Sequence, residues 1–529
     1  MTSSAPIWRH IGTSPPPEST RERLTTVIVG AGPVGLTMAL DLGRRGHRVT
    51  VLNKLNYIAV GSKAICFAKR TLDIWQRLGA AEAMVRKGVR WETGKVFWGQ
   101  REHPIYQFDL LPVKDQRMPA FINLQQYYAE ELLVEALSRL PNVDIRWGHE
   151  VTALTAHTDC TELRVSCGEF SYAIDASWLI ACDGHKSPIR QLMGLDFAGR
   201  MFEDNFLIAD IRVAQEGAAE RRFWFDPPFN PGQSALLHKQ PDDVWRLDFQ
   251  LGPNIDRAAC VRPENVEPLV RGLIGKEVQF TPVWYSVYTF HCRRMERFVH
   301  DRVIFAGDSA HLVSPFGARG CNGGIADADN LCWKLDLVLK GDASPRLLDS
   351  YNSEATAIAD ENIRCSTRST DFMTPKSTVS RAFRDAVLEL ANKFEFARPW
   401  VNSGRLSQAV SYPNSDLNTP DANGGEWGGI PPGSPAIDAP IGEGWLLDRL
   451  GDRFVLLTNG WRGAVPIGID TVDVSNSASD TGLIRQRYDL QPQSAYLIRP
   501  DQYVAARWRN PTQDDVNAAV ARATGAGLV

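Results

Sequence analysis

The chain has 529 residues, which is too long for a single small binding module and, at about 150 residues per domain, predicts three or four domains. Its 58 Lys+Arg and 62 Asp+Glu leave a net charge of -4, so the chain as a whole lacks the basic surface that binds nucleic acid. No apolar run reaches the roughly 18 residues of a membrane-spanning helix, and the N-terminus lacks the apolar core of a signal peptide. We therefore expect a cytoplasmic protein that binds neither nucleic acid nor a membrane.

The nine cysteines indicate neither a metal site nor a disulfide framework. They are scattered between Cys66 and Cys365, without a CxxC pair or the Cys/His spacing of a zinc site. We expect buried, reduced thiols and no bound metal. No cysteine follows Cys365, so the last part of the chain cannot carry out dithiol chemistry.

The first elements predict an α/β fold with a parallel, doubly wound sheet. Residues 1–24 are rich in Ser, Thr and Pro and are expected to form a flexible tail. An apolar, β-branched run at 25–29 is followed by a glycine cluster, a helical pattern up to Leu42 and a second apolar strand at 48–52. This order is that of a βαβ unit.

The middle and the end of the chain have different patterns. Between about 200 and 290, apolar and polar residues alternate with period two, as in 245–250, which predicts an antiparallel sheet with one exposed face. Residues 350–400 have a charged, helical pattern, and 403–440 are rich in Gly, Pro, Asn and Ser. We expect a domain boundary near residue 400.

A glycine motif joins the first strand to the first helix. Glycines here allow a tight turn and let a pyrophosphate approach the N–H groups and the positive dipole of the helix N-terminus. Asn53 ends the second strand, where an acid usually holds the ribose hydroxyls, and Lys54 is a candidate reader of a 2′-phosphate. This motif alone leaves NAD, NADP and FAD open. Its candidate residues are Gly30, Gly32, Pro33, Val34 and Gly35.

Two further motifs resemble those of the flavin-dependent aromatic hydroxylases. The segment 179–190 (LIACDGHKSPIR) resembles the DG motif of that family, and the segment 302–311 (RVIFAGDSAH) resembles its GD motif. The segment 315–324 (PFGARGCNGG) resembles the flavin loop that follows. Together with the glycine motif, they occur in the family's order over about residues 25–345. The resemblance implies that the nucleotide is FAD.

The GD motif also has a physical interpretation. A short buried strand delivers Gly307 and Asp308 at its C-terminal end, where ligands bind in open α/β sheets, so Asp308 can accept a hydrogen bond from a ribityl hydroxyl. The glycine-rich loop leads into a helix whose N-terminus presents free N–H groups and a positive dipole. The resemblance places the flavin N1/O2 edge there and the carbonyl of Pro315 near the reacting ring. The other candidate residues of this loop are Gly320, Asn322 and Gly323.

The resemblance assigns further cofactor-binding residues. It implies that Asp183 and Gly184, with Arg190 as their organising partner, shape the flavin pyrophosphate region and the path of NAD(P)H. Two weaker correspondences are Lys63, where many relatives have an Arg at the adenosine phosphate, and Gln126 (less favourably Gln125), which resembles a glutamine that touches the isoalloxazine.

Within the family, the segments 234–246 and 317–320 are most similar to the 3-(3-hydroxyphenyl)propionate hydroxylase type, whose substrates are varied phenols. The implied reaction is hydroxylation of a small phenolic substrate through a flavin C4a-hydroperoxide, formed from FAD, O2 and either NADPH or NADH. The resemblance also implies a homodimer. The substrate, the ring position and the nucleotide preference stay open.

Other interpretations fit some of these motifs. A hydroxylase of a larger polyketide or antibiotic phenol differs only in pocket size, and an FAD-dependent reductase of the same fold uses the same cofactor motifs. The WxWxIP motif expected of flavin-dependent halogenases is not found. Three intact cofactor motifs and an inserted sheet argue against a flavin-binding protein without enzymatic activity.

The predicted antiparallel sheet carries the candidate catalytic residues. A phenolate is a better nucleophile than a phenol, so the site needs a base or relay, a dry pocket and donors for any substrate carboxylate. His238 is the first candidate for phenol activation because His titrates near neutral pH, and Asp248 is the second. The resemblance implies that Arg246, on the same strand face as Asp248, contacts the mobile flavin. With Pro315 these are the candidate catalytic residues, and Trp224, Phe225 and Tyr288 are candidate pocket aromatics.

The C-terminal segment resembles the thioredoxin-like domain of many of these hydroxylases, through 432–440 and 450–457, and is expected to be structural or to form a dimer contact. The predicted parts are a flexible tail (1–24), a Rossmann-like, glutathione-reductase-like FAD-binding domain (25–195 plus 291–345), a substrate-binding antiparallel sheet (196–290), a helical segment (346–400) and the thioredoxin-like domain (401–529).

Overall fold

The computed structural model describes residues 13–15, 21–58, 63–110, 113–213, 219–401, 406–421, 427–475 and 482–526. Of the predicted flexible tail at 1–24, residues 1–12 and 16–20 lie outside this described part. The tail prediction is wrong for residues 21–24, which begin strand β1 (Arg21–Val29). These polar residues are ordered because β1 pairs with a neighbouring strand from Arg21 onward and because the Arg21 guanidinium lies 2.7 Å from the Asp175 carboxylate.

A mainly parallel sheet forms the first unit, and its start confirms the predicted βαβ order. Helix α1 (Pro33–Arg44) begins directly after the glycine motif, because proline fits the first turn of a helix. It is buried along almost its whole length, which explains its nearly continuous apolar sequence. In sheet order the strands are β17 (Val299–His300), β18 (Val303–Phe305), β11 (Phe170–Ala181), β1, β2 (Val49–Asn53) and β8 (Val143–Trp147); β10 (Thr161–Cys167) also pairs with β11, and β9 (Glu150–Ala156) pairs with β10.

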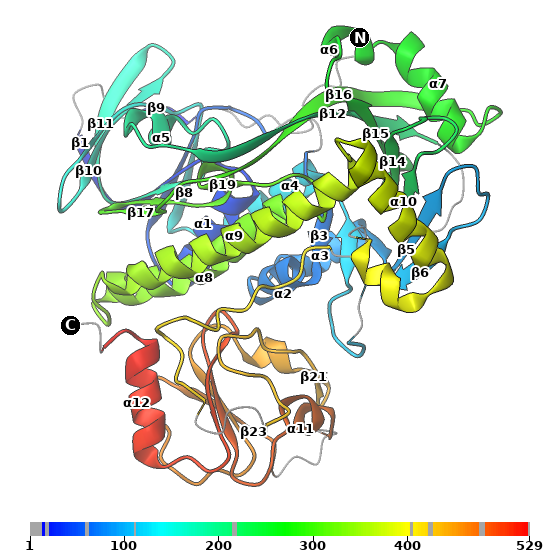
Figure 1. The fold of residues 1–529 in the computed structure, drawn as a ribbon. Coiled ribbons are helices and arrows are strands. Elements are labelled where there is room, and N and C mark those ends of the chain that lie inside the picture. Colours follow the sequence, from blue (N-terminus) through cyan, green and yellow to red (C-terminus); the bar gives the residue numbers. More distant parts are fainter. Residues whose placement is uncertain are drawn as a thin grey trace.

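Helices link this sheet to the rest of the molecule (Figure 1). Helix α8 packs on α1, and the long helix α9 packs on α8 and reaches the second sheet. None of the described helices has both the length and the hydropathy of a membrane span. The elements are α2 (Lys69–Arg77), α3 (Ala81–Lys87), α4 (Gln126–Leu137), α5 (Pro188–Leu192), η1 (Gly307–Ser309), α8 (Gly320–Lys340), α9 (Leu347–Met373) and a small sheet of β3 (Cys66–Ala68), β7 (Phe121–Asn123) and β4 (Val89–Trp91).

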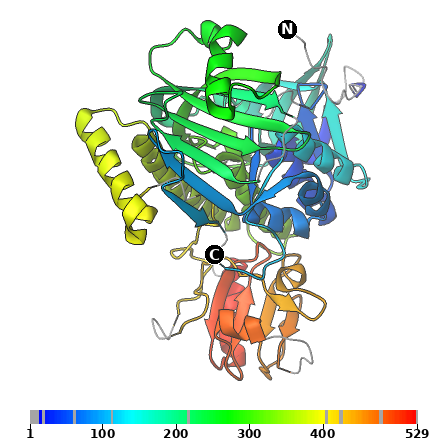
Figure 2. The same ribbon diagram turned by 90° about the vertical axis from the view of Figure 1, so that its right-hand side faces the viewer.

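A second, eight-stranded sheet lies beside the first (Figures 1 and 2). It contains the predicted period-two strand at 245–250 and also takes in two strands from 93–109, so it extends beyond the predicted 196–290 segment. Helix α7 (Pro263–Ile274) packs on its outer face, after the short α6 (Arg257–Cys260), and α10 (Thr378–Lys393) with η2 (Glu395–Trp400) packs at one end. In order the strands are β19 (His311–Leu312), β16 (Thr281–Arg294), β12 (Ala198–Arg212), β15 (Val244–Gly252), β14 (Ser234–Lys239), β13 (Arg221–Phe225), β5 (Thr93–Trp98) and β6 (Tyr106–Asp109).

The C-terminal unit is a four-stranded mixed sheet with its own core. A second apolar cluster, which contains Trp333 of α8 and Phe454, joins this unit to the helices of the first (Figure 1). The elements of the C-terminal unit are β20 (Pro440–Ile441), β21 (Gly444–Trp445), η4 (Leu446–Arg449), β22 (Val455–Thr458), β23 (Asp470–Asp473), α11 (Gly482–Tyr488), β24 (Ala495–Ile498), β25 (Val504–Trp508) and α12 (Gln513–Ala523).

A buried charge cluster crosses the same interface. Glu354 of α9 accepts hydrogen bonds from Arg499 at 2.6 and 2.9 Å and from Lys334 of α8 at 2.7 Å. These three side chains are almost completely buried, and burial lowers the pKa of Lys334 to about 8. Arg499 also pairs with the buried carboxylate of Asp501, whereas Glu354 is the carboxylate that bridges Arg499 and Lys334 across the interface.

We expect Glu354→Gln to destabilise the protein by about 3–5 kcal/mol, because removing one partner leaves an uncompensated buried charge. Urea unfolding followed by circular dichroism measures the loss. The control is Glu389→Gln, which removes solvent-accessible ion pairs with Arg101 and Lys393 and should cost less than about 1 kcal/mol. Equal stability of the two variants would contradict the role of this cluster.

Candidate functional site

A cavity of about 630 Å³ lies between the carboxyl ends of β1, β11 and β18 and the inner face of the second sheet. Ligands bind at this end of the strands in open α/β sheets. Most of the predicted site residues line the cavity. The predicted residues that lie behind its wall are Gly35, Arg190, Gly307 and Gly323.

The glycine turn after β1 touches the loop after β11. Gly30 has a φ of +109°, and a Cβ there would lie 2.3 Å from the carbonyl oxygen of Cys182, so the position requires glycine. At Gly32, by contrast, no described residue other than its two chain neighbours has an atom within 4 Å of the position that a Cβ would take. The turn and the start of α1 therefore present N–H groups and a positive dipole to open space in the cavity.

Asn53 holds this turn in place. Its Oδ1 accepts a hydrogen bond from the Ala31 N–H at 3.1 Å, and its Nδ2 donates to the Leu55 carbonyl at 2.9 Å. The amide is thus engaged with the backbone on both sides. Lys54, the next residue, is exposed at the cavity wall.

Asp308 lies in η1, directly after β18, and faces the cavity. The turn is fixed from behind by Asp327, which accepts a hydrogen bond from the Gly307 N–H at 2.9 Å and lies 2.6 Å from Nε2 of His311. Within the described residues the Asp308 carboxylate has no hydrogen-bond partner. Asp308 is exposed to the open cavity, and desolvation by the surrounding protein raises its pKa. It is therefore available to a ligand hydroxyl.

Asp183 and Arg190 do not bond directly to each other in the described structure. Asp183 Oδ2 accepts from the Ile189 N–H at 3.0 Å, while its Oδ1 is buried without a partner. Arg190 donates to the carbonyls of Ser309 at 2.7 Å and His185 at 2.9 Å. Arg190 thus ties the loop after β11 to the turn after β18, and this places the Asp183 loop indirectly.

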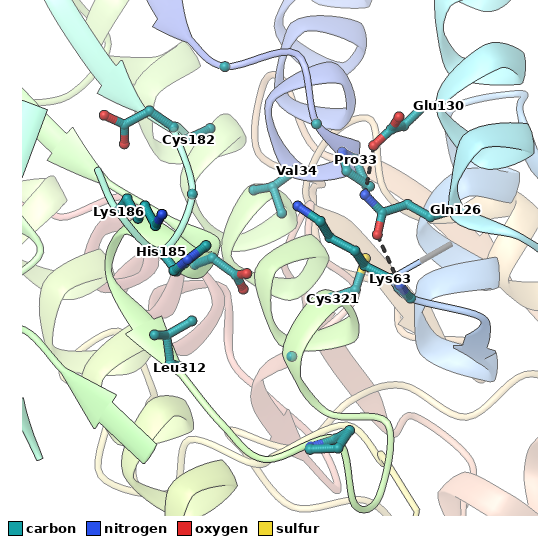
Figure 3. Close-up of a pocket in the computed structure, with 18 of the residues that line it drawn as sticks. Pro33, Val34, Lys63, Gln126, Glu130, Cys182, His185, Lys186, Leu312 and Cys321 are labelled. Atoms are coloured by element: carbon teal, nitrogen blue, oxygen red, sulfur yellow. Dashed lines mark hydrogen bonds between the residues drawn. The ribbon is translucent and has the colours of Figure 1, made fainter. Parts of the chain in front are cut away.

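Gln126 fixes the opposite wall of the cavity. It accepts a hydrogen bond from the Ala64 N–H at 3.0 Å and donates to Glu130 at 2.8 Å (Figure 3). Lys63, beside Ala64, extends into the cavity (Figure 3). Gln125 is buried and points instead to the turn between β14 and β15, which favours Gln126 as the cavity residue.

The loop between β19 and α8 closes one side of the cavity. The Ala318 N–H donates to the Pro315 carbonyl at 2.9 Å and forms a turn. Helix α8 begins at Gly320, whose N–H lies in the first helical turn, so the positive end of the helix faces the cavity. The Asn322 side chain accepts from the Ala68 N–H at 2.9 Å and links this loop to β3.

The inner face of the second sheet brings three predicted catalytic side chains together. His238 on β14 lies opposite Arg246 on β15, and Arg246 lies opposite Asp210 on β12. Arg246 donates to Asp210 through Nε and an Nη at 2.8 Å each, and to the Lys63 carbonyl at 3.2 Å. Asp248 Oδ2 lies 3.6 Å from Nε2 of His238.

Burial and charge set the protonation of this cluster. Burial, with Arg221 and Arg246 nearby, holds the pKa of His238 well below its usual range, so His238 is neutral. Burial raises the pKa of Asp248 to about 6, against the opposing effect of Arg246. A cavity carboxylate that titrates near neutral pH is suited to accept a proton. These pKa shifts favour Asp248, the second sequence candidate, over His238 for that role.

Sequence analysis missed Arg221, the first residue of β13, which lines the same cavity and is only 6% exposed. The alternation of β13 buries residues 221, 223 and 225. The sequence shows this alternation with period two, but it does not show which of the two consecutive arginines, Arg221 or Arg222, faces inward.

The predicted pocket aromatics are correct for Tyr288 only. Trp224 lies on the outer face of β13 because side chains alternate along a strand, and Phe225 belongs to the core between the sheet and α10. The Tyr and Phe residues that line the cavity are Tyr57, Tyr288, Phe206, Phe290 and Phe316, the last three with ring centroids 5.0–5.5 Å apart.

These features fit an FAD molecule. Open space lies beside Gly32, the N-termini of α1 and α8 both face the cavity, and the Asp308 carboxylate can accept a hydrogen bond from a ligand. The first helix end suits a pyrophosphate, Asp308 suits a ribityl hydroxyl, and the second helix end suits the electron-rich edge of the flavin.

Comparison with known proteins gives the same picture. Residues 23–366 match the protein family described as an FAD binding domain. The chain is 27% identical over 523 residues to the 3-(3-hydroxy-phenyl)propionate/3-hydroxycinnamic acid hydroxylase of Burkholderia cenocepacia (strain HI2424), covering 92% of this chain and 94% of the relative. It is 28% identical over 524 residues to the protein of that name from Escherichia coli O8 (strain IAI1), covering 90% and 91%.

Solved structures confirm the predicted fold. The flavin-dependent monooxygenase PieE, in complex with FAD and substrate, superposes with a TM-score of 0.80 at 22% identity, over 95% of this chain and 99% of that one. The p-nitrophenol 4-monooxygenase PnpA from Pseudomonas putida DLL-E4 superposes with a TM-score of 0.65 at 27% identity, over 73% and 100%.

We expect Gly32→Ala to fold normally but to bind FAD about tenfold or more weakly, because its methyl group would occupy space that the cofactor needs. Fluorescence titration of the apoprotein with FAD measures the affinity, and the melting temperature of the apoprotein checks folding. Gly444→Ala, in β21, is the control and should bind FAD like the wild type. Unchanged FAD affinity in Gly32→Ala would contradict this placement of the cofactor.

Proposed function

Since the chain belongs to the FAD binding domain family of the flavin-dependent aromatic hydroxylases, we propose that it hydroxylates a phenol with one oxygen atom of O2, at the expense of NADH or NADPH. The observation that carries this proposal is the shared cavity, in which the FAD-binding loops face a sheet with a titratable Asp248. The names of the two relatives given above describe hydroxylases of hydroxyphenyl acids, which supports a phenolic substrate. Cytoplasmic location and a homodimer stay predictions.

FAD is the cofactor of the family, and in its reduced form it activates O2 for transfer of one oxygen atom to the ring. In our proposal the glycine turn at 30–35 and the N-terminus of α1 hold the pyrophosphate. Asp308 accepts a hydrogen bond from the ribityl chain, and the N-terminus of α8 stabilises negative charge at the flavin edge.

The second sheet prepares the substrate. Asp248 accepts the proton of the phenol hydroxyl, which makes the ring a stronger nucleophile. Neutral His238, 3.6 Å away, orients the Asp248 carboxylate without adding a charge. Arg246 is neutralised by Asp210 and fixes the strand face against the Lys63 segment.

The aromatic wall keeps water out of the reaction. Phe206, Phe290 and Phe316 form a compact apolar cluster beside the Pro315 turn. A dry cavity prevents unproductive loss of activated oxygen and strengthens the electrostatic effect of the polar groups. The wall therefore separates the oxygen chemistry from solvent.

The direct test follows NADH and NADPH oxidation by the FAD-loaded protein in air, with simple phenols, hydroxyphenyl acids, resorcinols and larger polyphenols. We expect one of these classes to stimulate oxidation and to yield a product heavier by one oxygen atom in mass spectrometry. Reduction of the bound FAD without an oxygenated product from any class would favour the reductase alternative.

We expect Asp248→Asn to lower kcat/KM for the phenol by about 100-fold or more, because the proton acceptor is lost. The carboxylate form is the active one, so wild-type kcat/KM should rise with pH through about 6 and then level off. In the variant, kcat/KM should not rise with pH in this range. Asp243→Asn, at the exposed β14–β15 turn, should keep both the wild-type kcat/KM and its rise with pH. A wild-type profile in Asp248→Asn would assign proton removal to another group.

A further inference from the structure

Arg221 places a guanidinium group on the apolar side of a strand. It shares that side of β13 with Phe223 and Phe225, which belong to a hydrophobic core. The next residue, Arg222, points to the opposite side and donates to Glu220 at 2.7 Å. The two neighbouring arginines therefore differ in environment, one paired at the surface and one buried at the cavity.

Arg221 has no ion-pair partner within 4 Å among the described residues. Its side chain makes no hydrogen bond in this part of the chain, and its Nε is buried without a partner. Arg246, another arginine of this sheet face, donates two hydrogen bonds to Asp210, whose carboxylate neutralises it. A buried guanidinium without an anion is costly, so the cavity is built to receive a negative group at Arg221.

The surrounding residues do not supply that negative group. Strands β13 and β14 are antiparallel, and Arg222 lies opposite Leu237. The next residue of β14, His238, therefore lies beside Arg221. Asp248 interacts electrostatically with Arg221, but its ion-pair partner within 4 Å is His238 and not Arg221. Burial still raises the pKa of Asp248 to about 6, as expected for a carboxylate without close neutralisation.

We propose that Arg221 binds an oxyanion of the substrate at the sheet end of the cavity, and so selects phenols that bring a negatively charged oxygen to this position. The inference rests on the proposed function, whose substrate it specifies. The oxyanion has two sources, a carboxylate substituent or the phenolate oxygen itself. A guanidinium recognises either one by charge-assisted hydrogen bonds.

Ligand binding to the oxidised, FAD-loaded enzyme tests the proposal without turnover, through the change in flavin absorbance. The probes are the pairs 3-phenylpropionate with 3-phenylpropionamide and benzoate with benzamide, and also 4-nitrophenol, whose own absorbance reports its ionisation. If the source is a carboxylate, wild-type enzyme prefers the acids over the amides. If it is the phenolate, 4-nitrophenol binds in its ionised form at a pH where it is neutral in solution.

We expect Arg221→Met to lose about tenfold to hundredfold affinity for the charged probes and to keep its affinity for the amides. Arg221→Lys should keep part of the preference, since it keeps the charge. Arg222→Met is the matched control and should bind every probe like the wild type, and FAD content and melting temperature check the folding of all three variants.

The proposal is overturned if the wild type shows no preference for a charged probe, or if Arg221→Met binds all probes like the wild type. The outcome is separable from that of the proposed function. Oxygenation of a phenol without charge selectivity would refute the role of Arg221 alone. Charge selectivity that depends on Arg221, without oxygenation of any phenol, would refute only the hydroxylase activity.

Discussion

The site depends on a close backbone contact between two loops, at a glycine that places no side chain between them. Gly30 approaches the Cys182 carbonyl so closely that a Cβ would lie 2.3 Å from its oxygen. This contact brings the ends of β1 and β11 together, and Arg190 extends the same arrangement to the end of β18 by donating to Ser309. Three loops from distant parts of the chain thereby form one cofactor cradle, with the N-termini of α1 and α8 directed into it.

The second sheet completes the site by an uneven distribution of charge. Asp210 neutralises Arg246, His238 is kept neutral by burial beside two arginines, and Asp248 titrates near pH 6. Arg221 is a cation of this sheet face that forms no ion pair within 4 Å among the described residues. An enzyme that must ionise a phenol in a dry cavity needs a proton acceptor and a compensating positive charge. The sheet provides both on one face, opposite the cofactor loops.

The cofactor cradle was predictable because its signals are local: glycines at fixed spacing, an acid after a buried strand, and helical periodicity after a loop. The roles of Asn53 and Asn322 were harder to predict, because both amides bind backbone groups whose position only the fold determines. Arg221 was missed since neighbouring arginines on a strand look alike until the sheet faces are known. The Glu354–Arg499 contact joins residues 145 positions apart, and no local pattern marks it. The incorporation of β5 and β6 into the second sheet likewise follows from tertiary pairing.

The central claim is that one cavity holds FAD against the glycine loops and a phenol against the second sheet. A crystal structure of the FAD-loaded protein with a bound phenol would test it most directly. The account predicts FAD beside Gly32 and Asp308, with the phenol hydroxyl within hydrogen-bonding distance of Asp248. A phenol bound away from the inner face of the second sheet, or FAD bound away from the glycine turn, would contradict it.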